Sequence, residues 1–226
     1  MADSSDTSAQ ESSLDPASGS ARVTTRTGDD GTTGLLGELR VPKTDRTIVA
    51  LGEVDEATST LGVARAACRA AGLTRVHDLL LGFQNDLYAL MGDIATTPEA
   101  RAREAKPRVR EPGSRKRPSP EGRPKIGLYL SDAKLEALDA LVLSLRQEVQ
   151  IGTRFIVPGD HPASAALDLA RAVTRRAERA VIPLTQQGWL PNTTPQRYLN
   201  RLSDVLFLLG RLADAELGGP SQLAQR

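Results

Sequence analysis

Three charged side chains follow one another along a single apolar-periodic stretch. Arg171, Arg175 and Glu178 are four and three residues apart, so a helix places them on one face. Two guanidinium groups and a carboxylate in a row can bind a polyanion such as a nucleotide triphosphate. The alternative is a solvated face whose charges pair with one another, and this stretch alone favours that simpler interpretation.

A glycine-rich segment near the start of the chain offers a second set of anion-binding groups. Residues 24–37 read TTRTGDDGTTGLLG, with a glycine at every third position from Gly28 onward. Glycine lets the backbone approach a ligand closely, and threonine hydroxyls and bare N–H groups donate to phosphate. It is not a P-loop, because no Lys-Ser or Lys-Thr pair follows the last glycine. Lys43 adds a cation just downstream; the alternative is a glycine loop that binds nothing.

Four further residues are candidates through their positions. Asp55 lies on the shoulder of an apolar helix face, and Phe155 directly precedes a Pro-Gly turn. Asn200 and Asp204 are one helical turn apart and can serve a site or cap a neighbouring helix. The sequence shows no Ser-His-Asp set, no catalytic Cys-His set and no dense carboxylate cluster. This pattern argues against hydrolysis and against a di-metal centre, and no metal site is predicted.

Apolar residues at three- and four-residue spacing predict the elements that must position these groups. Five helices are expected, over residues 45–71, 73–95, 131–150, 160–183 and 195–217. Pro162 suits a first helical turn, so the fourth of them should begin near His161. Aromatic residues make up only 3% of the chain, which indicates a core of Leu, Ala and Val. The predicted fold is an all-α five-helix bundle preceded by the glycine loop.

The 226 residues fit one domain with flanking segments. Residues 1–22 and 218–226 are expected to be tails, the first of them disordered, and residues 23–217 the helical-bundle domain. Residues 98–125 form a proline-rich insertion with ten Lys and Arg against four Glu, which is also expected to be disordered. No aromatic residue interrupts the insertion, so weak RNA binding is the lesser alternative to a solvated loop.

Composition excludes several classes of protein. The formal net charge of +1 is too small to indicate binding to nucleic acid or to a membrane surface. The single cysteine, Cys68, excludes an intrachain disulfide framework, and His77 and His161 are too far apart in sequence to form a metal-ligand pair. No apolar run reaches the ~20 residues of a membrane span, and the first twenty residues do not resemble a targeting peptide. We expect a cytoplasmic protein with no membrane or nucleic-acid partner.

Six segments together resemble the PduO-type ATP:cob(I)alamin adenosyltransferases, or corrinoid adenosyltransferases. They are TRTGDDGTTGL, VPKTD, LGEVDEATSTLG, FIVPG, LARAVTRRAER and RYLNRLSDVLF, in this order over residues 23–215. The resemblance implies a homotrimeric five-helix bundle with active sites between subunits. It implies transfer of the 5′-deoxyadenosyl group of ATP to the cobalt of cob(I)alamin, giving adenosylcobalamin and triphosphate. The alternative is a non-catalytic bundle that binds ATP or corrinoid and delivers adenosylcobalamin to a partner enzyme.

The resemblance also implies roles for individual residues. Asp55 and Arg171 would form a salt bridge that supports the subunit interface and the site. Phe155 would press on the lower face of the corrin and displace the axial base, giving a four-coordinate cob(II)alamin that is easier to reduce. With Arg175, these three make up the predicted catalytic set. ATP with Mg²⁺ would be bound by Thr25, Arg26, Thr27, Gly28, Thr32, Thr33, Lys43, Arg175, Arg176, Ala177, Glu178, Arg179, Asn200 and Asp204.

The implied chemistry accounts for the missing general base. Co(I) is a strong nucleophile, so the protein needs to orient the reactants and stabilise the leaving triphosphate. Implied partners are a flavoprotein reductant and an adenosylcobalamin-dependent enzyme. Two features depart from the family pattern: Asp160 stands in PGD where a second glycine is more common, and the basic insertion at residues 98–125 is unusual.

Overall fold

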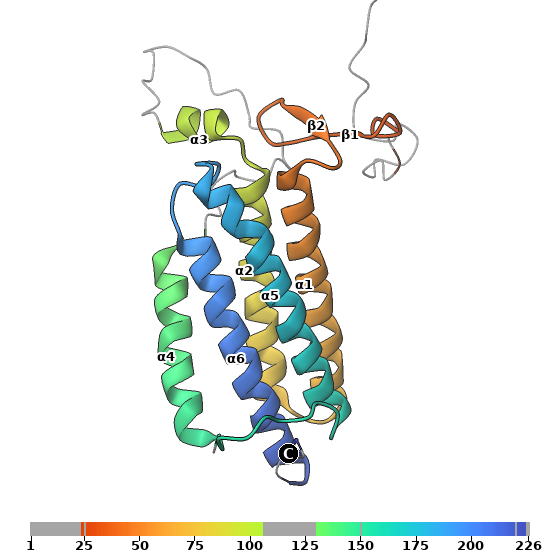
Figure 1. Ribbon diagram of the computed structural model, residues 1–226, viewed down its shortest axis with the longest axis vertical. Coiled ribbons are helices and arrows are strands. Elements are labelled where there is room, and N and C mark those ends of the chain that lie inside the picture. Colours follow the sequence, from red (N-terminus) through yellow and green to blue (C-terminus); the bar gives the residue numbers. More distant parts are fainter. Residues whose placement is uncertain (1–23, 25, 106–129, 150, 220, 225–226) are drawn as a thin grey trace, which may run out of the picture.

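Leucine, alanine and valine at helical spacing form five long helices in this protein. The computed structural model describes residues 24, 26–105, 130–149, 151–219 and 221–224. The long helices are α1 (Arg46–Ala70), α2 (Thr74–Ala95), α4 (Asp132–Glu148), α5 (Pro162–Gln186) and α6 (Thr194–Leu217). Consecutive long helices run in opposite directions, α1 packs against α2 and α5, and α6 packs against α5 and α4 (Figure 1). The prediction of an all-α five-helix bundle is confirmed.

The core confirms most of the predicted helix faces and corrects that of α1. In α1, the predicted inward residues Ile48, Leu51 and Thr58 are only partly buried. The face is rotated toward small side chains, which let α1 approach its two neighbours closely. The fully buried alanines of this face are Ala50, Ala57 and Ala64. All six predicted core residues of α6 are buried: Leu199, Leu202, Val205, Leu206, Leu209 and Leu212.

The boundaries of α5 agree with the prediction at one end only. His161 is its N-cap, with Nδ1 accepting from the backbone N–H of Ala163 at 3.3 Å, and Pro162 occupies the first turn. The predicted end at Pro183 is wrong, because the helix continues to Gln186. A proline so close to the C-terminus removes only its own hydrogen bond, and the carbonyl of Pro183 still accepts from the N–H of Gln187 at 3.0 Å.

A short antiparallel hairpin lies beyond the N-terminal end of α1 (Figure 1). Strands β1 (Thr32–Gly34) and β2 (Arg40–Pro42) pair with Thr33 opposite Val41. The residue between them that joins the bundle is Leu36, whose N–H donates to the carbonyl of Ala95 at 2.8 Å. Sequence patterns predicted only a loop here. We call this end of the bundle, with residues 26–43, the glycine-loop end.

The first part of the insertion is helical, which corrects the expected disorder of residues 98–105. Helix α3 spans Pro98–Ala105. Thr97 caps it by accepting from the N–H of Ala100 at 3.2 Å, and Pro98 follows as the first helical residue. Arg101 joins α3 to the bundle by donating to the carbonyl of Trp189 at 2.8 Å. The remainder of the insertion and the predicted tail 1–22 lie outside the described residues.

At the opposite end, the connection from α4 to α5 meets the chain that follows α6. Ile156 and Leu223 form an isolated antiparallel bridge there. We call this end, with residues 154–160 and 221–224, the Phe155 end. None of the helices that the structure describes is both long and apolar enough to cross a lipid bilayer.

Candidate active site

The glycine loop and the predicted lysine come together. The backbone N–H of Lys43 donates to the carbonyl of Gly31 at 2.8 Å. A methyl group placed on Gly28 would lie 3.2 Å from Lys43 Nζ and 3.0 Å from the carbonyl oxygen of Thr32. The ammonium group therefore folds back over the loop, and a side chain at position 28 would crowd both it and the backbone. The result is a small cationic surface built from backbone and one lysine.

Two residues that sequence reasoning did not single out hold this loop in shape. Asp30 Oδ1 accepts from both the N–H and the hydroxyl of Thr32, at 2.9 and 2.8 Å. Arg40 Nη2 donates to the carbonyl of Thr27 at 2.6 Å and to the hydroxyl of Thr32 at 2.7 Å. The bond from the Thr32 N–H, and then that from its hydroxyl, lower the pKa of Asp30. Asp-x-Thr is an Asx-turn pattern that could have revealed Asp30, whereas nothing local marks Arg40.

Two of the other predicted loop residues are accessible to a ligand. Arg26 and Thr27 are exposed, and Arg26 has a positive φ of 59°, which places it in the left-handed region. Thr33 is half-buried within the hairpin. Thr25 lies outside the described residues.

The predicted arginines of α5 separate into distinct environments. Arg175 and Arg179 are exposed, one helical turn apart. Arg176 instead pairs with α1, with Nε 2.5 Å from Glu53 Oε2 and Nη2 bonded to Glu56. These hydrogen bonds, first that to Glu53, raise the pKa of Arg176. Ala177 is fully buried, so its side chain cannot reach a ligand.

Glu178 and Asn200 are in direct contact. Asn200 Nδ2 donates to Glu178 Oε1 at 3.1 Å, linking α6 to α5. Both line a surface pocket of about 310 Å³ between α4, α5 and α6. Asp204 accepts from Arg201 at 2.9 Å, and Arg201, which lines the pocket, also donates to Asp139 at 2.5 Å. The pocket thus presents an amide and a carboxylate to a polar ligand.

Asp55 and Arg171 do not pair within this chain. Asp55 is exposed on α1, and Arg171 Nε lies 3.9 Å from Asp168 Oδ1 on its own helix. The contacts of Arg176 with Glu53 and Glu56 place Asp55 at the level of Arg176. Arg171 is five residues earlier on α5, which corresponds to roughly 7 Å along the axis. This offset separates the two side chains along the bundle.

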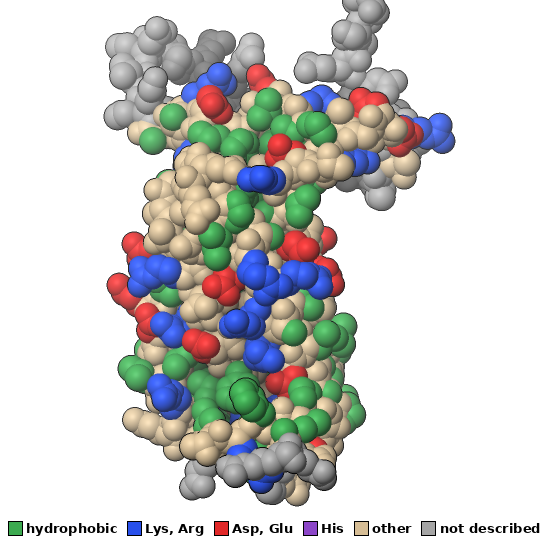
Figure 2. All heavy atoms as spheres, in the orientation of Figure 1, with side chains coloured by type: hydrophobic (Ala, Val, Ile, Leu, Met, Phe, Trp, Pro, Cys, Tyr) green, Lys and Arg blue, Asp and Glu red, His purple; other side chains and the backbone are tan. Residues whose placement is uncertain are grey.

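Phe155 is 87% exposed at the end opposite the glycine loop. Val157, two residues further along the chain, is also exposed, at 44%, and so is Leu169 of α5, at 54%. Figure 2 shows hydrophobic side chains gathered toward this end, and Lys and Arg side chains gathered over the middle of the bundle. The 25 residues of α1 correspond to a length of roughly 37 Å, so Lys43 and Phe155 of one chain stand far apart.

Comparison with known proteins identifies relatives over most of the chain. The family model for cobalamin adenosyltransferases matches residues 23–213. The corrinoid adenosyltransferase of Mycobacterium tuberculosis is 36% identical over 198 residues, which cover 86% of this chain and 90% of the relative. The corrinoid adenosyltransferase of Citrobacter freundii is 35% identical over 195 residues, covering 85% of this chain and 95% of the relative.

This chain also resembles a solved structure of the same family in its fold. That structure is of a variant of the PduO-type ATP:corrinoid adenosyltransferase from Lactobacillus reuteri complexed with cobalamin and ATP. The two folds superpose with a TM-score of 0.72 at 25% sequence identity, over 90% of this chain and 99% of the other. The likeness extends over the glycine loop, α5 and α6, which carry the predicted site. This chain belongs to the cobalamin adenosyltransferase family.

Proposed function

We propose that this chain transfers the 5′-deoxyadenosyl group of ATP to the cobalt of cob(I)alamin and releases triphosphate. The observation that carries the proposal is the position of Lys43 Nζ against Gly28, in a loop whose Thr32 is already fixed by Asp30 and Arg40. A preformed group of N–H donors, hydroxyls and an ammonium suits a polyphosphate.

The glycine loop binds the triphosphate in this proposal. Gly28 lets the backbone approach the phosphates, and Lys43 neutralises part of their charge. Arg26, Thr27, Thr32 and Thr33 surround them, and Mg²⁺ arrives with ATP, shared between its phosphate oxygens. Thr25 joins the set in the proposal.

The exposed face of α5 completes the ATP site. Arg175 and Arg179 lie free of ion pairs with the described residues and are directed to solvent, so their guanidinium groups are available to phosphate. Glu178 and Asn200 line the neighbouring pocket and offer hydrogen bonds to ribose hydroxyls or the base. Arg176 acts by holding α5 against α1 through Glu53 and Glu56. Asp204 positions Arg201 beside the pocket.

Phe155 provides an apolar surface for the corrin. A phenyl ring that is 87% exposed is costly in water and gains by stacking under a large flat ligand. A ring pressed against the lower face would leave no room for the axial base. Four-coordinate Co(II) is easier to reduce than the five-coordinate form, because an axial donor raises the energy of the orbital that accepts the electron.

The chemical step is a nucleophilic displacement at the ribose. The electron pair of Co(I) attacks the 5′ carbon of ATP, and a Co–C bond forms as the bond between that carbon and the triphosphate oxygen breaks. The leaving triphosphate takes the electron pair of the broken C–O bond, and the cobalt becomes formally Co(III). No proton is transferred in the step, so the chain's task is to align the reactants and to stabilise negative charge with Lys43, Arg175 and Arg179.

The site is shared between copies of the chain in this proposal. Lys43 and Phe155 stand at opposite ends of one bundle, and Asp55 and Arg171 are offset along it, so each pair is brought together by a neighbouring subunit. A homotrimer with one site at each interface satisfies both requirements. The Asp55–Arg171 salt bridge would then link subunits directly beside the site. Adenosylcobalamin would pass from there to an enzyme that uses it, and a flavoprotein would supply the reducing electron.

An anaerobic assay with ATP, Mg²⁺ and chemically reduced cobalamin tests the proposal. We expect a light-sensitive Co–C bond to form with stoichiometric release of triphosphate, in the absence of any partner protein. Folded protein that binds ATP and cobalamin without forming this bond would overturn the catalytic proposal and favour a delivery role.

Replacing Arg175 by alanine tests the role of α5 in the same assay. Loss of one charged contact to phosphate should lower kcat/KM by roughly 10- to 100-fold. Arg146→Ala is the matched control, because Arg146 is an exposed arginine on α4 that does not line the pocket of Glu178 and Asn200. Equal kinetics for the two variants would remove Arg175 from the site.

A further inference from the structure

The segment that follows α6 runs antiparallel to the segment that carries Phe155. The N–H of Ala224 donates to the carbonyl of Phe155 at 2.8 Å, and the N–H of Val157 donates to the carbonyl of Gln222 at 2.9 Å. The guanidinium of Arg154 adds a bond to the carbonyl of Ala224. Residues on both sides of Phe155, and its own carbonyl, are therefore bonded to residues 222–224.

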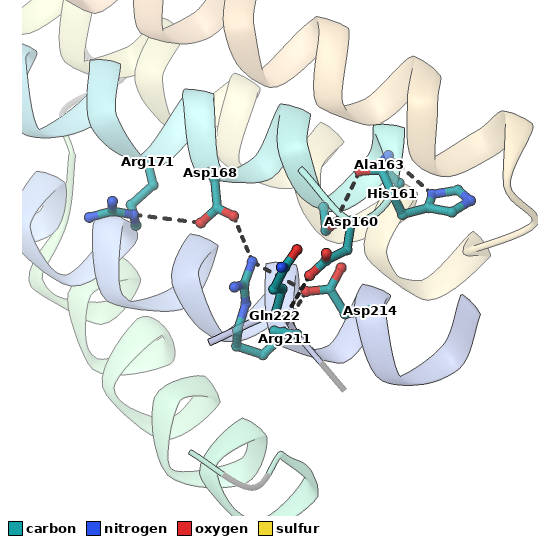
Figure 3. A network of polar contacts seen from close by, with 10 residues as sticks. Asp160, His161, Ala163, Asp168, Arg171, Arg211, Asp214 and Gln222 are labelled. Atoms are coloured by element: carbon teal, nitrogen blue, oxygen red, sulfur yellow. Dashed lines mark hydrogen bonds and ion pairs between the residues drawn. The ribbon is translucent and has the colours of Figure 1, made fainter. Parts of the chain in front are cut away.

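Two carboxylates fix the start of this segment. Asp160 Oδ2 accepts from the backbone N–H of Gln222 at 2.7 Å, and Asp214 Oδ2 accepts from the hydroxyl of Ser221 at 2.6 Å. Figure 3 shows Asp160 and Gln222 directed toward each other, beside Asp214 of α6. Gly159, with φ of +126°, makes the turn that places Asp160 there.

Asp214 is itself anchored in a buried ionic cluster. Arg211 Nη2 lies 2.6 Å from Asp168 Oδ2 and 3.5 Å from Asp214 Oδ2, and all three side chains are almost fully buried. Arg171 lies at the outer edge of the cluster, next to Asp168 (Figure 3). The 221–224 segment is thus attached to a rigid part of the bundle at one end and to the Phe155 turn along its length.

We propose that Asp160 and residues 221–224 are positioning elements for Phe155, and that the Asp160–Gln222 bond sets how the phenyl ring meets the corrin. The proposal rests on the proposed function of Phe155. The ring is exposed and packs against little of its own chain, so its position is determined by the backbone around it. That backbone is held chiefly by its bonds to residues 222–224.

The role assigned to Asp160 differs from that of a group in contact with substrate. Its carboxylate is used by the N–H of Gln222, on the inner side of the turn. Without this bond the 221–224 segment keeps its other contacts but loses its attachment next to Gly159. Phe155 would then sample several positions, and fewer of them would exclude the axial base from the cobalt.

Two pairs of variants isolate this single hydrogen bond. Asp160→Ala removes the acceptor, whereas Asp160→Asn keeps an oxygen that can accept the same N–H. Gln222→Pro removes the N–H donor, whereas Gln222→Ala keeps it because the donor is the backbone. Each disruptive variant therefore has a control at the same position. Phe155→Ala serves as the reference for complete loss of the ring.

The measurement is the fraction of four-coordinate cob(II)alamin on the enzyme with ATP bound, by electron paramagnetic resonance and absorption. Asp160→Ala and Gln222→Pro should lower the ratio of four- to five-coordinate cobalt roughly three- to tenfold, the effect of losing one hydrogen bond near the surface. Asp160→Asn and Gln222→Ala should match the unaltered chain. The Kd for ATP should stay unchanged in all four, which a general loss of structure would not allow.

The outcomes separate this inference from the proposed function. If Phe155→Ala abolishes the four-coordinate species while Asp160→Ala leaves it intact, the positioning role is wrong and the role of Phe155 stands. If Asp160→Asn is as defective as Asp160→Ala, the negative charge of Asp160 determines the four-coordinate fraction and the hydrogen bond to Gln222 does not. The inference as stated is then overturned. If the unaltered chain forms no adenosylcobalamin, the proposed function itself fails.

Discussion

The two ends of the bundle hold their functional groups in different ways. At the glycine-loop end, Asp30 and Arg40 bond to Thr27 and Thr32 on the exposed surface, within 13 residues of one another. At the Phe155 end, the turn is held by a segment more than 60 residues away, which is rooted in the buried cluster of Asp168, Arg211 and Asp214. One network is local and solvated, and the other is long-range and partly buried.

This difference determines what each network contributes. Exposed pairs are screened by water, so those of the loop shape a binding surface while adding little to stability. Buried charges have lost their hydration, so removing one partner leaves the others uncompensated. We therefore expect substitutions at the loop end to change ligand affinity, and substitutions in the buried cluster to change stability as well as the position of Phe155.

The largest effect should follow from Arg211→Ala. The variant leaves Asp168 and Asp214 buried without their cation, and it loses the contact of the guanidinium with the Phe207 ring, 5.5 Å from its centre. A cost of about 3–5 kcal/mol in the free energy of unfolding is expected for a broken buried ion pair. Urea unfolding at one fixed chain concentration measures it, since assembly adds to apparent stability.

Arg146→Ala again provides the control, because substitution of an exposed arginine without such partners usually changes stability by less than about 0.5 kcal/mol. Similar unfolding free energies for Arg211→Ala and Arg146→Ala would contradict the contrast between the two ends. It would mean that the cluster of Arg211 with Asp168 and Asp214 does not anchor the Phe155 end.

Asp93 offers a second test, because it is a buried carboxylate at the glycine-loop end. It is 5% exposed, and its Oδ2 accepts from the N–H of Leu130 at 3.0 Å, while Oδ1 has no hydrogen-bond partner among the described residues. Burial raises its pKa from the usual 3.8 to about 6, against the opposing effects of the Leu130 N–H and of Arg101.

The sign of the pH dependence follows from these two values. Below pH 3.8 the carboxyl group is protonated in both the folded and the unfolded chain. Between pH 3.8 and about 6 the unfolded chain loses the proton while the folded chain keeps it, so stability falls as pH rises. Above about pH 6 Asp93 is ionised in both states, and the free energy of unfolding is lower by the full cost of burying the charge, on the order of 3 kcal/mol for a shift of this size.

Asp93→Asn should remove this pH dependence, because an amide does not titrate and still accepts from Leu130. Between pH 4 and pH 7 the unfolding free energy of the variant should rise relative to that of the unaltered chain. A constant difference across this range would show that Asp93 is ionised in the folded protein, with a compensating partner like those of Asp168 and Asp214.

The parts of the site that sequence could predict are the local ones. Periodicity placed Arg175, Glu178 and Asn200 on helix faces, and the contact between the last two follows once α5 and α6 pack. The glycine spacing marked the loop, and Lys43 lies close enough in sequence to fold onto it. Thr97 followed by Pro98 is a typical start of a helix, here α3. The low apolar content of residues 98–105 nevertheless favoured a disordered loop.

The long-range contacts left no readable pattern. Nothing in the spacing of Arg211 on α6 marks it as buried, yet Asp168 of α5 faces it and both side chains are almost fully buried. Residues 221–224 are a short polar segment without periodicity, and sequence favoured a simple tail. Their pairing with the Phe155 turn depends on where α6 ends relative to the start of α5, which only the assembled bundle determines.

The smallest effect on stability, and the sharpest test of the contrast, is expected for Arg40. Its side chain is 47% exposed, so Arg40→Ala should change the unfolding free energy by less than about 1 kcal/mol. The same change removes the bonds of the guanidinium to the carbonyl of Thr27 and the hydroxyl of Thr32, so the loop is held less firmly before ATP binds. The KM for ATP should rise roughly three- to tenfold with kcat nearly unchanged.

Arg40→Lys separates charge from geometry at this position. A lysine keeps the positive charge, but its single ammonium cannot reproduce the planar fork that bonds to Thr27 and Thr32 together. We therefore expect its KM to lie between those of the unaltered chain and Arg40→Ala. Neither substitution should change the four-coordinate fraction of cob(II)alamin once ATP is saturating. If that fraction falls, the two ends are coupled across the proposed subunit interface, and the loop helps to position Phe155 of a neighbouring chain.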